Sequence, residues 1–253
     1  MRAIIATCAL VVLAGCGSSV QSAAKRHPPT SVEAPPSHAE QQLALTAKRK
    51  LRALVVQAAQ RCTAAIEQVD ALSAPGAATT CASLQLAENP FTPEGARSTS
   101  RQLQRDLKLL ATDGAASSTV RARLVQLPAQ LSFAVTRVIL SPPEAARRAE
   151  GILERALRLT VPQAAHGDAM ATAELTGAVE AARTSLEAVA PLTNAVAPSE
   201  AAKLTAALQA LPPSPPAQAL QWPAYARSVG DLARVSAAIS TQLYDFRQGG
   251  AYV

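Results

Sequence analysis

The apolar residues of this chain recur at alternating steps of three and four, which is the spacing of one face of an α-helix. One series covers seven positions: Leu51, Val55, Ala58, Cys62, Ala65, Val69 and Leu72. A second covers six positions near the C-terminus: Val229, Leu232, Ser236, Ile239, Leu243 and Phe246. No segment shows the apolar–polar alternation of a strand. The sequence therefore predicts an all-α protein.

Helix boundaries are indicated by prolines, glycines and capping residues. Starts are predicted at Gln41, Thr92-Pro93-Glu94, Ser117 or Ser118, the capping box Ser141-Pro142-Pro143-Glu144, Asp168, Ala197-Pro198-Ser199-Glu200 and Pro223. Ends or breaks are predicted at Ala74-Pro75-Gly76, Asp113-Gly114, Val161-Pro162 and Pro191. We therefore expect a bundle of six or seven helices over residues 40–211. The connector PPSPP (212–216) should lead to a C-terminal helix within 217–253 that packs on the bundle or extends it.

The N-terminus has the features of an export signal. Arg2 supplies a positive charge, and an apolar run too short to span a bilayer follows. The run ends in Leu13-Ala14-Gly15-Cys16, which resembles the lipobox of bacterial lipoproteins. The resemblance implies cleavage after residue 15 and lipid attachment to Cys16. It also implies a place in the cell envelope: the outer membrane facing the periplasm in a Gram-negative cell, otherwise the outer face of the cell membrane.

Residues 16–39 are rich in proline, serine and charge and lack an apolar period, which predicts a disordered tether. About 22 flexible residues span about 26 Å. Loss of residues 1–15 removes Arg2 alone and lowers the formal net charge from +6 to +5. This mild, dispersed charge does not predict binding to nucleic acid.

Two cysteines remain after Cys8 leaves with the signal and Cys16 takes the lipid. Cys62 and Cys81 are an even pair in an oxidising compartment, and the chain between them is long enough to return. We therefore predict a disulfide between them.

No motif indicates catalysis, a metal site or a cofactor. His27, His38 and His166 lack metal-ligand spacing, and the carboxylates Glu150 and Glu154 are expected to form surface ion pairs with Arg147 and Arg158. Alanine-rich helix faces let helices approach closely, so we expect little volume for a pocket.

Two surface features carry functional hypotheses. The basic residues Lys48, Arg49, Lys50 and Arg52 either form a solvated helix edge or contact an anionic surface such as lipid headgroups. Five of the seven aromatic residues lie in the last 32 residues. Of these, Trp222, Tyr225 and Tyr244 either cap the core or contact a partner.

The sequence thus predicts a membrane-anchored helical lipoprotein that is not an enzyme. It would act by contact with an unidentified envelope protein, as an assembly, stabilising or inhibitory factor. Two alternatives stay open: an envelope enzyme acting on cell-wall polymer through a composite site, and a carrier of a small hydrophobic ligand. The sequence does not determine the oligomeric state.

Overall fold

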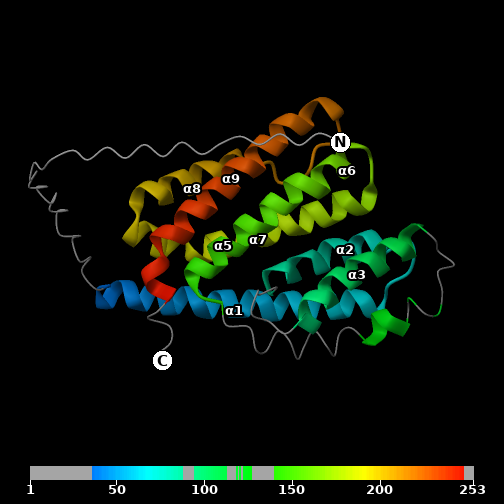
Figure 1. Ribbon diagram of the computed structural model, residues 1–253, viewed down its shortest axis with the longest axis horizontal. Coiled ribbons are helices and arrows are strands. Elements are labelled where there is room, and N and C mark those ends of the chain that lie inside the picture. Colours follow the sequence, from blue (N-terminus) through cyan, green and yellow to red (C-terminus); the bar gives the residue numbers. More distant parts are fainter. Residues whose placement is uncertain are drawn as a thin grey trace, which may run out of the picture. The chain divides into compact units, whose positions relative to one another are not determined.

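Helices account for nearly all of the residues that the computed structural model describes (Figure 1). These residues are 36–87, 94–112, 118, 120, 122–126 and 140–247. No strand occurs among them, so the all-α prediction is confirmed. They belong to one unit of the chain, Pro36–Val253. The signal segment, Cys16 and the tether up to Pro35 lie outside the described residues.

The first helix, α1 (His38–Glu67), begins two residues before the expected boundary at residue 40. The Ser37 hydroxyl accepts from the Glu40 N–H at 3.3 Å, and the Glu40 carboxylate accepts from the Ser37 N–H at 2.6 Å. This reciprocal capping box sets the start of the helix.

The expected continuation of α1 to Leu72 is wrong. The Asp70 carboxylate accepts from the Leu72 and Ser73 N–H groups and turns the chain, leaving Leu72 93% exposed. Ala74-Pro75-Gly76 starts the next helix, α2 (Ala74–Ala82), instead of ending α1. A proline in the first turn is compatible with a helix start because its missing N–H would have no partner there.

A 3-10 turn, η1 (Ser83–Ala87), follows α2, and α3 extends over Glu94–Thr112. The predicted apolar face of α3 is confirmed, since Leu103, Leu107 and Leu110 are fully buried. Of the next predicted helix, the described residues Val120 and Leu124 are buried, and the remainder of its apolar face lies outside the described residues.

A continuous helical rod follows, although Val161-Pro162 predicted an interruption. It consists of α5 (Pro142–Arg155), the π turn η2 (Ala156–Thr160) and α6 (Val161–Ala165). In the π turn the Val161 N–H bonds to the Ala156 carbonyl, five residues back. This wider turn accommodates Pro162, which lacks an N–H and crowds the preceding turn of an ordinary α-helix.

The capping box predicted at the start of α5 does not form. Ser141 occupies the N-cap position without a side-chain hydrogen bond, and its buried hydroxyl has no partner in the structure. The Glu144 carboxylate instead accepts from Arg148 at 2.7 Å.

The last long helices are α7 (Ala169–Val196), α8 (Pro198–Ala210) and α9 (Trp222–Gln242), with 3-10 turns η3 (Ala219–Gln221) and η4 (Tyr244–Arg247). Asp168 caps α7, as predicted. Pro191 does not end α7, however. Both Pro191 and Glu187, whose carbonyl loses its N–H partner, are exposed, so water can replace the missing bond.

The central helix is α7, which packs against α1, α2, α5, α8 and α9 (Figure 1). Helix α5 of the rod packs on α9. All six residues of the C-terminal apolar series are buried. The PPSPP connector therefore leads to a helix that completes the bundle.

Candidate functional site

The predicted disulfide is present and ties α1 to α2. The Cα atoms of Cys62 and Cys81 are 4.7 Å apart, and both residues are fully buried. Because Cys62 lies in α1 and Cys81 in α2, the bond fixes these two helices side by side.

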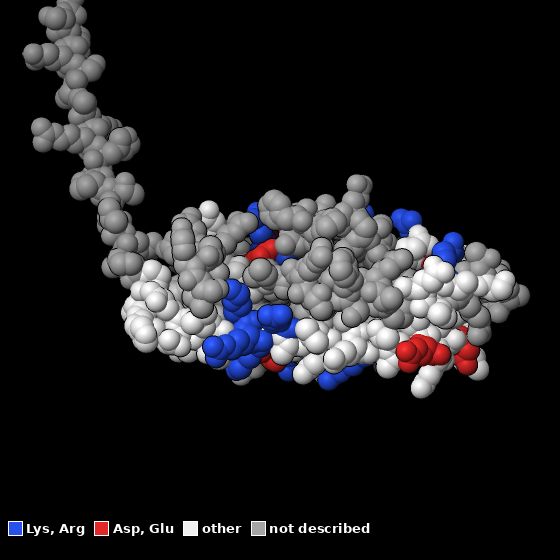
Figure 2. All heavy atoms as spheres, turned by 90° about the horizontal axis from the view of Figure 1, so that it is seen from below, with Lys and Arg blue, Asp and Glu red and all other residues white. Residues whose placement is uncertain are grey.

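The basic residues predicted to contact an anionic surface lie on α1. Arg49, Lys50 and Arg52 are exposed, whereas Lys48 is half-buried. Figure 2 shows a group of Lys and Arg side chains on the face that includes α1. We call Arg49, Lys50 and Arg52 the basic face.

Among the residues that the structure describes, no carboxylate forms an ion pair with the basic face. Between Glu40 and Glu67, α1 carries five basic residues and no acidic residue. In the described part of the chain, ion pairs hold Arg123, Arg148, Arg158, Arg183 and Arg234, but none involves Arg49, Lys50 or Arg52. The basic face is therefore available to an anionic partner.

Two of the three aromatic residues proposed as partner contacts are buried, which is a correction. Trp222 and Tyr225 are 8% and 2% exposed and pack edge to face, with ring centroids 5.8 Å apart. Burial raises the pKa of Tyr225 to about 12. They belong to the core because α9 packs on the bundle. Tyr244, which falls off the apolar series, is 53% exposed.

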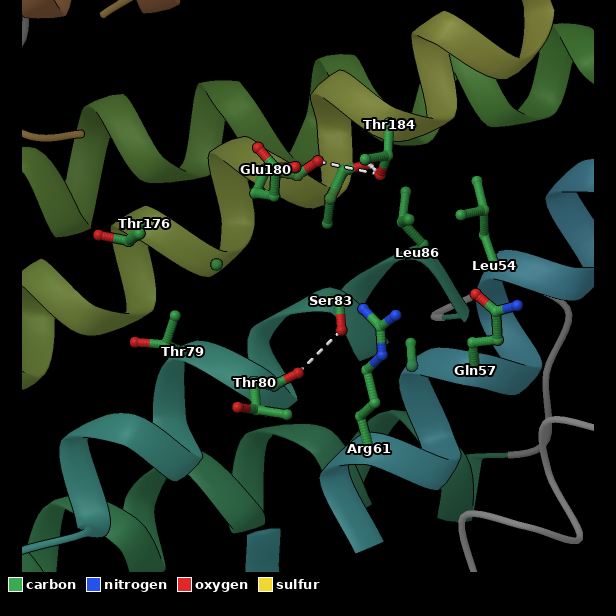
Figure 3. Close-up of a pocket in the computed structure, with 13 residues that line it drawn as sticks. Leu54, Gln57, Arg61, Thr79, Thr80, Ser83, Leu86, Thr176, Glu180 and Thr184 are labelled. Atoms are coloured by element: carbon green, nitrogen blue, oxygen red, sulfur yellow. Dashed lines mark hydrogen bonds between the residues drawn. The ribbon is translucent and has the colours of Figure 1, made fainter. Parts of the chain in front are cut away.

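A groove lies between α1, α2 and α7, and it is small, as the alanine-rich helix faces led us to expect (Figure 3). Its volume is about 290 Å³. The α1 wall contributes Gln57 and Arg61, and the α7 wall contributes Glu180. Hydroxyls supply the other polar groups: Thr79, Thr80, Ser83, Thr176 and Thr184. The small residues Ala58 and Ala181 leave space between the walls, and Gly177 lines the groove where α7 approaches α2.

Sequence reasoning missed this groove because its α7 wall is far along the chain from the consecutive helices α1 and α2. A local signal existed, since Arg61 and Thr80 each directly precede a disulfide cysteine. A disulfide between two helices brings the residues next to its cysteines together.

The carboxylates Glu150 and Glu154 both lie on α5. Glu154 pairs with Arg158 at 3.7 Å, as predicted, and both side chains are more than half exposed. Burial and the neighbouring Glu154 raise the pKa of Glu150, and Arg147 acts in the opposite direction. In the described ranges, no group of three or more His, Cys, Asp or Glu residues is arranged to hold a metal ion.

Within the same ranges, no helix combines the length and apolar character needed to cross a bilayer. Comparison with protein-family models, curated proteins and solved structures finds no match to this chain.

Proposed function

We propose that this chain is a lipid-anchored protein of the bacterial envelope that acts by contact, with its basic face against an anionic surface beside its anchor. The observation that carries the proposal is the exposed set Arg49, Lys50 and Arg52 on α1, which forms no ion pair with the described part of the chain. The lipobox-like residues Leu13 to Cys16 provide the reason to place this face near a membrane.

The distances are compatible with this arrangement. The basic face lies about 15–20 Å along α1 from His38 at 1.5 Å per residue. The expected tether spans about 26 Å when flexible. The basic face can therefore reach the lipid surface that holds Cys16.

The expected energy is useful but modest. Each basic residue near an anionic membrane contributes about 1 kcal/mol, so three contribute about 3 kcal/mol. That sum is insufficient for permanent attachment, but it would orient a protein already held by acyl chains. Such an orientation would present the rest of the bundle, including the exposed Tyr244, to a partner protein of the envelope.

The experiment compares binding to vesicles of phosphatidylglycerol and phosphatidylcholine with vesicles of phosphatidylcholine alone. The protein carries Cys16→Ser, so that no lipid masks the effect. Changing Arg49, Lys50 and Arg52 to glutamine should weaken binding to the anionic vesicles about a hundredfold at low salt, the equivalent of about 3 kcal/mol. The difference should shrink at high salt because ions screen exposed charges.

The matched control removes the same charge elsewhere, by changing the exposed Arg105, Arg147 and Arg227 to glutamine. This variant should bind nearly as tightly as the unchanged protein. Equal losses in the two triple variants would mean that net charge alone attracts the protein, and the assigned face would be wrong.

A further inference from the structure

We propose that the groove between α1, α2 and α7 binds a short peptide with free amino and carboxyl ends and small side chains. The first observation is the placement of two opposite charges. Arg61 stands on the α1 wall and Glu180 on the α7 wall (Figure 3). A ligand with opposite charges at its two ends matches this arrangement.

Among the described residues, neither of these exposed charges is held in an ion pair. No acidic side chain pairs with Arg61, and Arg183 interacts with Glu180 electrostatically without forming an ion pair with it. Arg183, one turn beyond Glu180, is paired with Glu187 at 3.0 Å. Both groups therefore keep their capacity to bind a ligand.

The hydroxyls of the groove are set up as hydrogen-bond acceptors. The Thr79, Thr80 and Ser83 hydroxyls donate to the carbonyls of Pro75, Gly76 and Thr80 at 2.9–3.1 Å. On the opposite wall, Thr176 and Thr184 donate in the same way to Thr172 and Glu180 at 2.8 and 3.0 Å. Since each hydroxyl proton is used, the oxygen lone pairs remain for a ligand that brings N–H groups.

The dimensions favour a small ligand. The volume of about 290 Å³ is at the lower end for ligand pockets. Ala58 and Ala181 leave room for methyl-sized side chains but offer no aromatic surface for a large apolar group.

The walls are also held in place before a ligand arrives. Arg61 and Thr80 adjoin Cys62 and Cys81, so the disulfide fixes the α1 and α2 walls relative to each other. A preformed site loses less entropy on binding.

A dipeptide would place its carboxylate on Arg61 and its ammonium group near Glu180 and the hydroxyl oxygens. The peptide N–H would supply one more donor. This assignment is independent of the basic face and does not require a membrane.

The test is isothermal titration of the full chain in detergent with dialanine in its L,L and D,D forms. N-acetyl and C-terminal amide derivatives probe the two ligand charges. We expect at least one form of dialanine to bind, and Arg61→Gln and Glu180→Gln each to weaken that binding about tenfold, as for one charge-assisted hydrogen bond. The C-terminal amide lacks the carboxylate that Arg61 would bind, so the Arg61→Gln variant should bind it about as well as the unchanged protein does. The acetylated peptide lacks the ammonium group, so the Glu180→Gln variant should likewise bind it about as well as the unchanged protein does.

Arg105→Gln, an exposed arginine outside the groove, is the matched control and should bind dialanine unchanged. Both groove variants change exposed side chains, and unaltered circular dichroism and melting would show that the fold is kept. The proposal is overturned if dialanine fails to bind at about 10 mM, near the weakest useful affinity. It is equally overturned if the blocked peptides bind as well as dialanine, or if the groove variants behave like the control.

Discussion

Gly177 allows α7 to lie directly on the backbone of α2. A Cβ atom built at this position would be 2.1 Å from the Thr79 carbonyl oxygen and 2.8 Å from the Ala82 Cβ. Backbone cannot move aside as the end of a flexible side chain can. The close approach of these helices, and with it one end of the groove, therefore depends on the absence of a side chain.

We expect Gly177→Ala to lower the free energy of unfolding by about 3 kcal/mol, the upper end for an overpacked core. Gly151 provides the matched control, because it lies in α5 with nothing within 4 Å of an added Cβ. Gly151→Ala should stabilise the protein by about 0.5–1 kcal/mol through helix propensity. Urea unfolding followed by circular dichroism measures both. A loss of less than about 0.5 kcal/mol at Gly177, the size expected of a surface substitution, would contradict the close contact.

The Asp168 carboxyl should make the free energy of unfolding depend on pH in the acid range. A hydrogen bond from Lys108, followed by smaller contributions from the N–H groups that it caps, lowers the pKa of this carboxyl below its ordinary value of 3.8, while burial acts in the opposite direction. A lowered folded-state pKa adds stability above the unfolded value, and this stability is lost as the pH falls through the folded pKa.

At pH 6, Asp168→Asn should therefore be less stable than the unchanged protein by about 0.5 kcal/mol, a small figure because the ion pair with Lys108 is partly exposed. The gap should close between pH 4 and pH 2. Urea unfolding at several pH values measures it, and a gap that stayed constant down to pH 2 would rule out the carboxylate charge as its source.

At the scale of elements, the disulfide joins two helices of unequal length. α1 has 30 residues and α2 has nine, and the connecting turn is held by Asp70 and Ser73. A short helix gains little stability by itself, so α2 depends on its packing against neighbours and on the covalent link.

Replacing Cys62 and Cys81 with serine should lower the free energy of unfolding by about 3 kcal/mol. This is the stabilisation expected from a disulfide that closes a loop of this length in the unfolded chain. The melting temperature should fall by about 6–12 °C for a chain of this size. The same fall should follow reduction of the unchanged protein. If the reduced protein and the double variant both melted as the oxidised protein does, the disulfide would have no stabilising role.

At the scale of the whole molecule, the proposed function depends on the lipid anchor. Cys16→Ser should abolish incorporation of labelled fatty acid and release the protein from membranes or leave it unprocessed. Metabolic labelling followed by fractionation checks this. Continued labelling of the variant would place the lipid elsewhere or dismiss the lipobox interpretation.

Much of the helical architecture was predictable from neighbouring residues. The series Val229 to Phe246 is buried throughout, and Asp168 caps α7, because helical periodicity and capping depend on residues within one or two turns. The disulfide was predictable from the cysteine count, the expected oxidising compartment and the reach of the chain between the two cysteines. The prolines were less informative about helix ends, because Pro162 and Pro191 both lie within helices. Packing against neighbouring helices and altered hydrogen bonding keep these helices intact there.

The sequence by itself determined the inward-facing residues of the long periodic series, such as Val229 to Phe246, since that pattern is local. Only the tertiary structure decided which helices become neighbours. It buried Trp222 and Tyr225, left Tyr244 and the basic face exposed, and opened a groove between Arg61 and Glu180. These outcomes depend on contacts between helices that are distant in the chain, whose approach is set by the shapes of packed side chains and by one glycine at a helix crossing.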